Sequence, residues 1–156
     1  MKNLFIFIAL SLCIYGSESC LGGKECNNVT PASEQAQIIA YAGSNGITAT
    51  AHSSGMYYQV INPGSGTQPT SVSTVTVKYT GKLTSDNTIF DQQIVTPVVI
   101  PLTDVIDGWK IGIPLIRKGG SIKLIIPSSM GYGCKGLGVV PPNSVLYFEI
   151  DLIDVQ

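Results

Sequence analysis

Residues 105–109 read Val105-Ile106-Asp107-Gly108-Trp109 and contain the single tryptophan of the chain. The residues that follow, 110–115, predict one or two turns of helix ending near Pro114, because proline removes a backbone donor and clashes with the preceding turn. In a chain otherwise patterned for strands, such a helix is expected to lie across a sheet, with the indole of Trp109 between them. Tryptophan supplies a wide, rigid apolar surface with one polar edge. The stretch therefore predicts either the floor of a pocket or simply the largest residue of the core.

Strand signals lie on both sides of this stretch. Alternating apolar and polar residues, typical of half-buried antiparallel strands, occur in 73–79, 121–126 and 145–155. Residues 56–61 are a further strand candidate, which ends at the turn residues 62–66. Shorter strand signals occur at 89–91 and 97–102. In the last strand, Leu146, Phe148 and Ile150 are expected to face the core, while Tyr147 and Glu149 are expected on the polar face. Neither a repeat nor a second domain is visible.

The composition excludes several classes of function. Charged residues make up 12% of the 156 residues, and the formal net charge is −1. This is not the basic field that nucleic-acid binding needs, so no nucleic-acid partner is expected. The only histidine, His52, lies in a small, polar segment, which leaves no histidine for a nucleophile–base pair or a metal site. No metal and no cofactor are expected.

The N-terminus predicts export. Met1-Lys2 precedes an apolar run over residues 4–15, and small residues follow up to Cys20, as in a secretory signal peptide covering residues 1–19. Small residues ahead of Cys20 are similar to a relaxed bacterial lipobox, in which the mature chain begins at a lipid-modified cysteine. Glu18 departs from the strict pattern, and ordinary cleavage after Ser19 would give the same first residue without lipid. We expect a periplasmic or cell-envelope protein anchored through Cys20, with no other membrane contact.

Three cysteines remain after export: Cys20, Cys26 and Cys134. An exported protein reaches a compartment that permits disulfides. If Cys20 carries lipid, Cys26 and Cys134 are free to pair. Otherwise, Cys20 and Cys26 could close a small loop and leave Cys134 as a thiol.

Residues 20–53 are interpreted as a flexible tether that includes a short helix. Ser33 is the expected N-cap, and the helix is expected to end at Gly43 or in the Asn45-Gly46 turn. The folded domain is expected to cover residues 54–156.

One motif match is rejected. Residues 131–136, Gly-Tyr-Gly-Cys-Lys-Gly, fit the dinucleotide fingerprint letter by letter. The fingerprint works only where its glycines open a helix whose N-terminus holds the pyrophosphate. The next residues, which include Pro141-Pro142, cannot form that helix.

A set of motifs in fixed order resembles the FK506-binding-protein (FKBP) family of peptidyl-prolyl cis-trans isomerases over about residues 54–156. The motifs are Val77-Lys78-Tyr79-Thr80-Gly81, Phe90-Asp91, Val105-Ile106-Asp107-Gly108-Trp109, Gly131-Tyr132-Gly133 and Val139-Val140-Pro141-Pro142-Asn143-Ser144, followed by Phe148. The resemblance implies an α+β fold in which a strongly bent antiparallel sheet wraps around one short helix. It also implies a hydrophobic pocket between them.

The resemblance assigns roles to individual residues. Trp109 is the pocket floor, and Asp91 and Tyr132 are polar groups at its mouth, with Asp91 expected to accept a hydrogen bond from a tyrosine hydroxyl. The backbone amide of Ile106 and the hydroxyl of Tyr132 are expected to hold ligand carbonyls. The walls are assigned to Tyr79, Phe90, Val98, Val105, Ile106, Val139, Val140 and Phe148. The sequence departs from the family at three places. Val98 is smaller than the aromatic found there in the family, and the segment 92–96 is shorter than usual and lacks the arginine that many members have. Leu137 lies near a position where some members carry histidine.

The expected function is cis-trans isomerisation of X-Pro bonds in exported polypeptides, with FK506-like macrolides as expected ligands. Two alternatives stay open. A binding module or holdase could capture proline segments in the same pocket but turn them over poorly, and the small Val98 slightly favours this. An inert all-β structural domain would pack the aromatic cluster shut.

Overall fold

The computed structural model describes residues 26–156. The expected signal peptide and Cys20 lie outside the described residues. Within the described part of the chain, no helix is long and apolar enough to cross a membrane.

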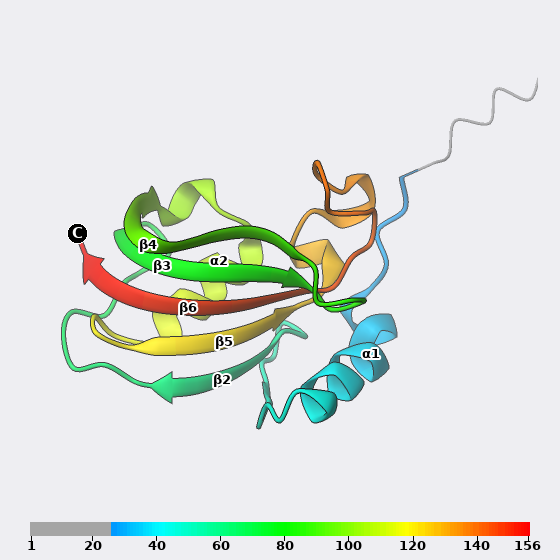
Figure 1. Cartoon of the computed structure of the whole chain (residues 1–156), viewed down its shortest axis with the longest axis horizontal. Helices are drawn as coiled ribbons and strands as arrows, with labels where there is room; N and C mark the ends of the chain where they lie inside the picture. Colours follow the sequence, from blue (N-terminus) through cyan, green and yellow to red (C-terminus); the bar gives the residue numbers. More distant parts are fainter. Residues whose placement is uncertain (1–25) are drawn as a thin grey trace, which may run out of the picture.

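The fold is built on one six-stranded antiparallel sheet, which curves in front of the helix α2 (Figure 1). The order across the sheet is β1-β2-β5-β6-β3-β4. The antiparallel sheet with a short helix expected from the sequence is confirmed. The strands are β1 Thr50–Ala51, β2 Tyr57–Asn62, β3 Thr74–Leu83, β4 Ile89–Pro101, β5 Ser121–Ile126 and β6 Leu146–Val155.

Strand β4 is longer than its sequence signals indicated. The two short signals belong to one strand on the sheet edge, whose register against β3 shifts between the pairs Val77–Val98 and Tyr79–Gln93. Pro97 lies inside this irregularity, which a proline tolerates on an edge strand because no ladder hydrogen bond needs its missing N–H. The pairing resumes at Tyr79–Gln93 and continues to Gly81–Asp91, which fixes Asp91 beside β3.

Helix α2 spans Asp107–Gly112 and continues into a single 3-10 turn, Ile113–Leu115, that contains Pro114. Gly108 and Gly112 are four residues apart and therefore lie on the same face of the helix. A Cβ atom on Gly108 would lie 2.5 Å from Cγ2 of Ile126, and one on Gly112 would lie 2.5 Å from Cδ1 of Leu124. The two glycines thus let the helix backbone rest directly on β5.

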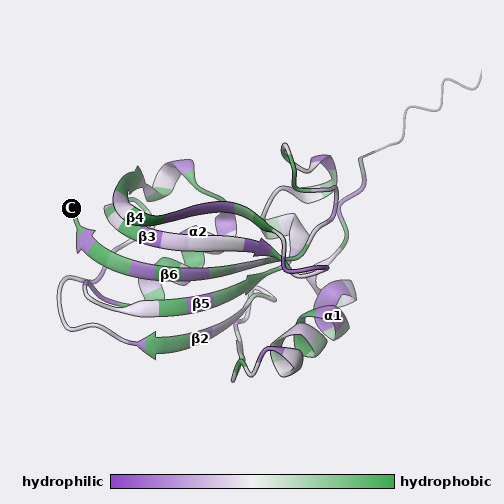
Figure 2. Cartoon of the chain, viewed as in Figure 1, coloured by the Kyte–Doolittle hydropathy of each residue, from purple (hydrophilic) through white to green (hydrophobic). Residues whose placement is uncertain are grey.

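The main core fills the space between α2 and the concave side of the sheet. Alternate residues of the strands face it, as Figure 2 shows by the alternating hydropathy along β5 and β6. Burying one such aliphatic side chain contributes about 1.5–3 kcal/mol. The side chains of this core with 2% exposure or less include Val75, Val77, Leu102, Ile113, Ile122, Leu124, Ile126, Leu146, Ile150 and Leu152.

Helix α1, Pro31–Ser44, begins earlier than expected. Thr30, and not Ser33, is the N-cap: its Oγ1 accepts a hydrogen bond from the backbone N–H of Ser33 at 3.4 Å. Pro31 follows at the first helical position, where its missing N–H costs nothing because that donor has no partner inside the helix.

The second core lies on the opposite face of the sheet, under α1. Tyr57, Ile125 and Tyr147 are direct cross-strand neighbours on β2, β5 and β6, and Ile38 of α1 packs with them. Tyr147, expected on the polar face of its strand, is only 3% exposed because α1 covers it. The described part of the expected flexible tether therefore differs from that expectation, since α1 is docked on the sheet.

Cys26 and Cys134 form a disulfide, with their Cα atoms 5.3 Å apart. This is one of the two pairings that the sequence left open, and the distance is ordinary for a disulfide. The bond joins the chain just before α1 to the loop that follows Tyr132.

Replacing Ile38 with Ala should lower the free energy of unfolding by about 2–5 kcal/mol, because the side chain is fully buried under α1. The neighbouring Ile39, 53% exposed on the same helix, is the matched control, and Ile39→Ala should cost at most about 0.5 kcal/mol. Urea denaturation of the oxidised protein measures both. Equal losses would contradict the docking of α1.

Candidate functional site

A cavity of about 340 Å³ opens between α2, the sheet and the loops at one end of the sheet. Three strands, the start of α2 and two loops contribute to it. Most of its wall is apolar or aromatic, and its polar side chains are two carboxylates and two tyrosine hydroxyls. The lining residues are Tyr79, Asp91, Ile100, Asp104, Val105, Ile106, Trp109, Tyr132, Leu137 and Phe148.

Trp109 forms the centre of an aromatic cluster at the cavity. Its ring centroid is 5.0 Å from that of Tyr79 and 5.3 Å from that of Phe148, and both partners stand nearly perpendicular to the indole. Edge-to-face pairs of this kind add about 0.5–1.5 kcal/mol beyond area burial. Trp109 is 4% exposed, so it belongs to the core and also lines the cavity. The two interpretations of this residue are therefore compatible.

Tyr79 and Asp91 form the strongest polar contact in the cavity. The Tyr79 hydroxyl donates to Oδ2 of Asp91 at 2.6 Å, a short bond of the charge-assisted type. Burial, the hydrogen bond to Asp91 and the negative charge of Asp91 all raise the pKa of Tyr79 well above 10.0. The pair thus keeps a phenol protonated and a carboxylate fixed in place, as expected for Asp91.

Tyr132 lies on the loop between two 3-10 turns, Ser128–Met130 and Gly133–Lys135. Its ring packs perpendicular to that of Phe90, with the centroids 6.3 Å apart. Burial first, and the charge of Asp91 second, raise the pKa of Tyr132 above its ordinary value. Its hydroxyl therefore stays protonated and can donate at any pH near neutrality.

Gly81 allows the rings behind the cavity to meet. It pairs with Asp91 on one side and Phe148 on the other. A Cβ atom at this position would lie 2.7 Å from Phe148 and 2.9 Å from Phe90, whose ring centroids are 5.5 Å apart. Phe90 thus supports Phe148 and Tyr132 from behind and is not itself among the lining residues.

Seven of the residues expected at the site line the cavity together: Tyr79, Asp91, Val105, Ile106, Trp109, Tyr132 and Phe148. Four other expected wall residues do not. Phe90 stands behind the lining rings, Val98 packs against the main core, Val140 is buried, and Val139 is 69% exposed. The chain reverses between Leu137 and Val140, which form an isolated bridge, and this turn brings Leu137 to the cavity instead.

Three lining residues were not assigned to the wall from the sequence: Ile100, Asp104 and Leu137. Ile100 is two residues beyond Val98, so strand alternation places it on the same face of β4. Asp104 ends the 3-10 turn Leu102–Asp104, directly before Val105. Leu137 departs from the family pattern, and its position at the cavity depends on the conformation of the turn.

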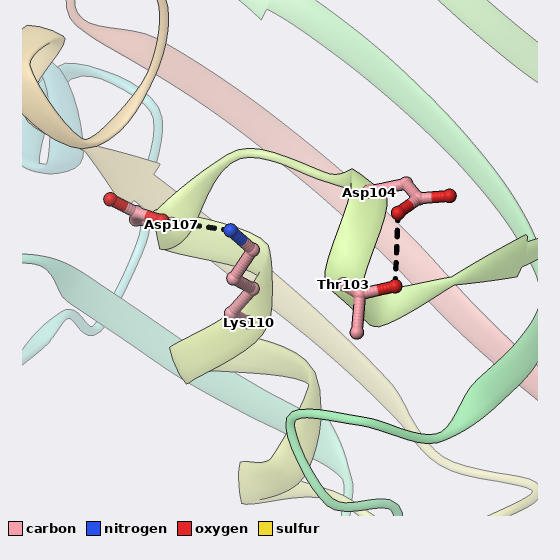
Figure 3. A network of polar contacts seen from close by, with 4 residues as sticks. All are labelled: Thr103, Asp104, Asp107 and Lys110. Atoms are coloured by element: carbon pink, nitrogen blue, oxygen red, sulfur yellow. Dashed lines mark hydrogen bonds and ion pairs between the residues drawn. The ribbon is translucent and has the colours of Figure 1, made fainter.

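The polar contacts around the start of α2 are local (Figure 3). Thr103 Oγ1 donates to Oδ1 of Asp104 at 2.9 Å, which fixes one carboxylate oxygen at the cavity. Lys110 pairs with Asp107 at 3.1 Å across the first turn of the helix. The side chains of Lys110 and Asp107 are 34% and 67% exposed, so water screens the pair and it contributes at most about 1 kcal/mol.

The sequence model of the FKBP-type peptidyl-prolyl cis-trans isomerase family matches residues 65–153. The chain belongs to this family. The match contains β3, β4, α2, β5 and most of β6, and every residue that lines the cavity lies within it. It leaves α1 and the Cys26 end of the disulfide outside.

Relatives and solved structures agree with the family assignment. The isomerase FkpA of Escherichia coli K12 is 42% identical over 106 residues, which is 67% of this chain and 39% of FkpA. The chain is also similar to the crystal structure of that FkpA, with a TM-score of 0.71 at 37% identity over 81% of this chain and 61% of that one. A peptidyl-prolyl cis-trans isomerase structure from Pseudomonas syringae gives a TM-score of 0.69 at 32% identity, over 83% of this chain and 98% of that one. The chain spans about two fifths of the length of the FkpA sequence it matches.

Replacing Asp91 with Asn should lower the pKa of both Tyr79 and Tyr132, because the Asp91 carboxylate raises both. Burial still acts, so neither value should return fully to 10.0. Tyrosinate absorbance during an alkaline titration measures the change. The matched control is Asp104→Asn, which removes the other cavity carboxylate and should leave both phenols unchanged.

The same substitution has a consequence for stability. The pKa values of the two phenols are raised in the folded state, so their contribution is fully present below pH 10 and is lost as pH rises through the raised values. The parent should therefore lose stability in alkali, and Asp91→Asn should lose less over the same range. Identical alkaline slopes would contradict the assigned role of Asp91.

Proposed function

We propose that this protein is a peptidyl-prolyl cis-trans isomerase that assists the folding of exported polypeptides by twisting X-Pro amides in the cavity over Trp109. The observation that carries the proposal is the convergence of an aromatic floor, the Tyr79–Asp91 pair and Tyr132 in one cavity of a chain from this family. The alternative is a binding module or holdase that uses the same cavity without efficient turnover.

Rotation about an X-Pro amide bond requires few catalytic groups from the protein. Rotation about an amide loses resonance, at a barrier of about 18–20 kcal/mol. The planar amide is the more charge-separated form, so an apolar, aromatic cavity disfavours it relative to the twisted form. Only interactions that are stronger in the twisted form lower the barrier. This needs neither a nucleophile nor a metal, and the aromatic wall of Trp109, Tyr79 and Phe148 suits it.

Two donors are proposed to hold substrate carbonyls. Ile106 is the N-cap of α2 and gives its carbonyl to the N–H of Trp109 at 3.0 Å, while its own N–H stands outside the hydrogen-bond ladder of the helix. The Tyr132 hydroxyl is the second donor. Asp91 orients Tyr79 and does not itself exchange a proton with the substrate. The apolar walls at Val105, Ile100 and Leu137 favour a bulky apolar residue before the proline.

The test is a protease-free isomerisation assay on a short peptide with an apolar residue before proline. The parent should accelerate exchange, and Tyr132→Phe should lower kcat/KM by about threefold to tenfold, since it removes one hydrogen bond. Its melting temperature should change little. Tyr58→Phe is the matched control, because Tyr58 packs against the main core away from the cavity and should keep full activity.

Trp109→Leu should weaken FK506 binding and moderately lower stability, because it keeps apolar volume but removes the flat floor. Parent protein that binds FK506 without accelerating isomerisation would favour the binding module. A Trp109→Leu variant that binds and isomerises like the parent would place the site elsewhere.

We further propose export to the periplasm or cell envelope, with a lipid anchor on Cys20. Support comes from the apolar N-terminal run and from the disulfide, which is typical of oxidising compartments. Because Cys26 pairs with Cys134, neither is left to pair with Cys20. Mass spectrometry of the mature protein should find a diacylglyceryl-modified Cys20. An unmodified thiol there in membrane-free material would refute the anchor and leave export intact.

A further inference from the structure

The loop that carries Tyr132 has little structure of its own. Tyr132 stands between Gly131 and Gly133, and only two single 3-10 turns flank it. Gly133 has a positive φ of 59°. A backbone of this kind does not fix the direction of a side chain by itself, so the position of the Tyr132 hydroxyl depends on what holds the loop at its two ends.

A carboxylate from α1 holds the loop ahead of Tyr132. Oε2 of Glu34 accepts the backbone N–H of Ser128 at 2.9 Å. Glu34 is 7% exposed and Ser128 is fully buried, and they are 94 residues apart in sequence. Without this acceptor the Ser128 N–H would be buried and unpaired, which is far costlier than losing an exposed hydrogen bond.

The chain just before α1 holds the loop after Tyr132. Cys26 is disulfide-bonded to Cys134, and Oδ1 of Asn28 accepts the backbone N–H of Cys134 at 2.8 Å. Asn28 also lies so close to Gly133 that a Cβ atom there would stand 2.6 Å from its Oδ1. Figure 1 shows this stretch running beside the loops that precede β6.

Both holding points belong to one rigid support. Helix α1 is docked on the far face of the sheet through Ile38 and Tyr41, whose hydroxyl donates to Asn87 at 2.9 Å. The sheet thus carries α1, α1 carries Glu34, and the residues before α1 carry the disulfide. Residues 26–34 reach the Tyr132 loop from outside the segment matched by the family model, 65–153.

We propose that residues 26–34 act as a brace that positions Tyr132, with Glu34, Asn28 and the Cys26–Cys134 disulfide as its positioning groups. This rests on the proposed isomerase function of the cavity. The brace fixes the position of the Tyr132 hydroxyl relative to the Ile106 amide. Its effect on the twisted substrate is therefore indirect and depends on the Tyr132 hydroxyl. The brace does not touch the substrate.

The decisive experiment is a double-mutant cycle in the isomerisation assay. Glu34→Ala should lower kcat/KM by about threefold to tenfold when Tyr132 is present, because the hydroxyl is no longer held. In a Tyr132→Phe background the same substitution should change kcat/KM by less than about twofold, since no hydroxyl remains to position. Glu34→Gln keeps a carbonyl acceptor for the Ser128 N–H and should restore most of the activity.

The matched control separates positioning from a general loss of stability. Ile122→Val removes a methylene group from the main core on β5, away from α1, Ser128 and the cavity lining, and it should leave kcat/KM near the parent value. Multiplicative losses from Glu34→Ala and Tyr132→Phe would overturn the brace. So would an Ile122→Val variant that loses as much activity as Glu34→Ala at equal loss of stability.

Removing the disulfide provides a second, independent test of the brace if Glu34→Ala fails to fold. The double variant Cys26→Ser/Cys134→Ser should also lose kcat/KM by a few fold, and only when Tyr132 is present. Full activity in this variant would overturn the proposal for the disulfide.

A readout that does not depend on catalysis keeps the brace separate from the proposed function. Amide hydrogen exchange at residues 131–134 should speed up by about tenfold or more in Glu34→Ala and in the disulfide-free variant, and stay unchanged in Ile122→Val. A parent without isomerase activity would refute the proposed function, and the exchange rates would still decide the brace. Unchanged exchange in both variants would overturn it.

Discussion

Helix α2 can approach β5 only because two of its six residues have no side chain. Gly108 and Gly112 face Ile126 and Leu124, and any side chain there would push the helix away from the sheet. Close contact brings Trp109 between helix and sheet, where Tyr79 and Phe148 meet the indole edge to face. The floor of the cavity, its aromatic walls and the placement of the Ile106 amide all follow from that one approach.

Both faces of the sheet are covered, and each face packs against a different part of the chain. The concave face holds the main core and the cavity. The opposite face holds α1 on the row Tyr57–Ile125–Tyr147, where buried hydroxyls are kept paired: Gln35 donates to Tyr57 at 2.9 Å, and Tyr147 donates to Glu149 at 2.6 Å. Tyrosines suit this position because their rings fill the core while their hydroxyls reach its polar edge. Helix α1, which was expected from the sequence to lie in a flexible tether, is therefore part of the structure around the candidate site.

Most strands, the short helix α2 and the place of Trp109 could be predicted from local pattern in the sequence. The bend of the sheet and the other site residues were predicted from the resemblance to the FKBP family. Strand alternation identified the core faces, and the stretch around Trp109 identified α2. The pattern failed where distant segments meet. Ile38 and Ile39 are adjacent and equally apolar, so the sequence does not show that one of them is buried against a face of the sheet. Tyr147 alternates with core residues and was assigned to the polar face, but another element covers it.

The turn around Leu137 shows a second kind of failure. Gly136 and Gly138 both adopt positive φ, a conformation that glycine reaches without cost and that sequence pattern does not specify. Their combined effect decides that Leu137, not Val139, reaches the cavity. The choice of disulfide partner was equally beyond the sequence, since it depends on a distance between residues 108 positions apart.

That disulfide makes a covalent ring of most of the folded chain. The ring from Cys26 to Cys134 contains α1, α2 and strands β1 to β5, and among the described strands β6 alone lies outside it. A protease that cuts once within the ring, for example in the exposed stretch near Val72, leaves two pieces that remain joined and already paired in the sheet. A single cut would therefore not release a fragment until the bond is reduced.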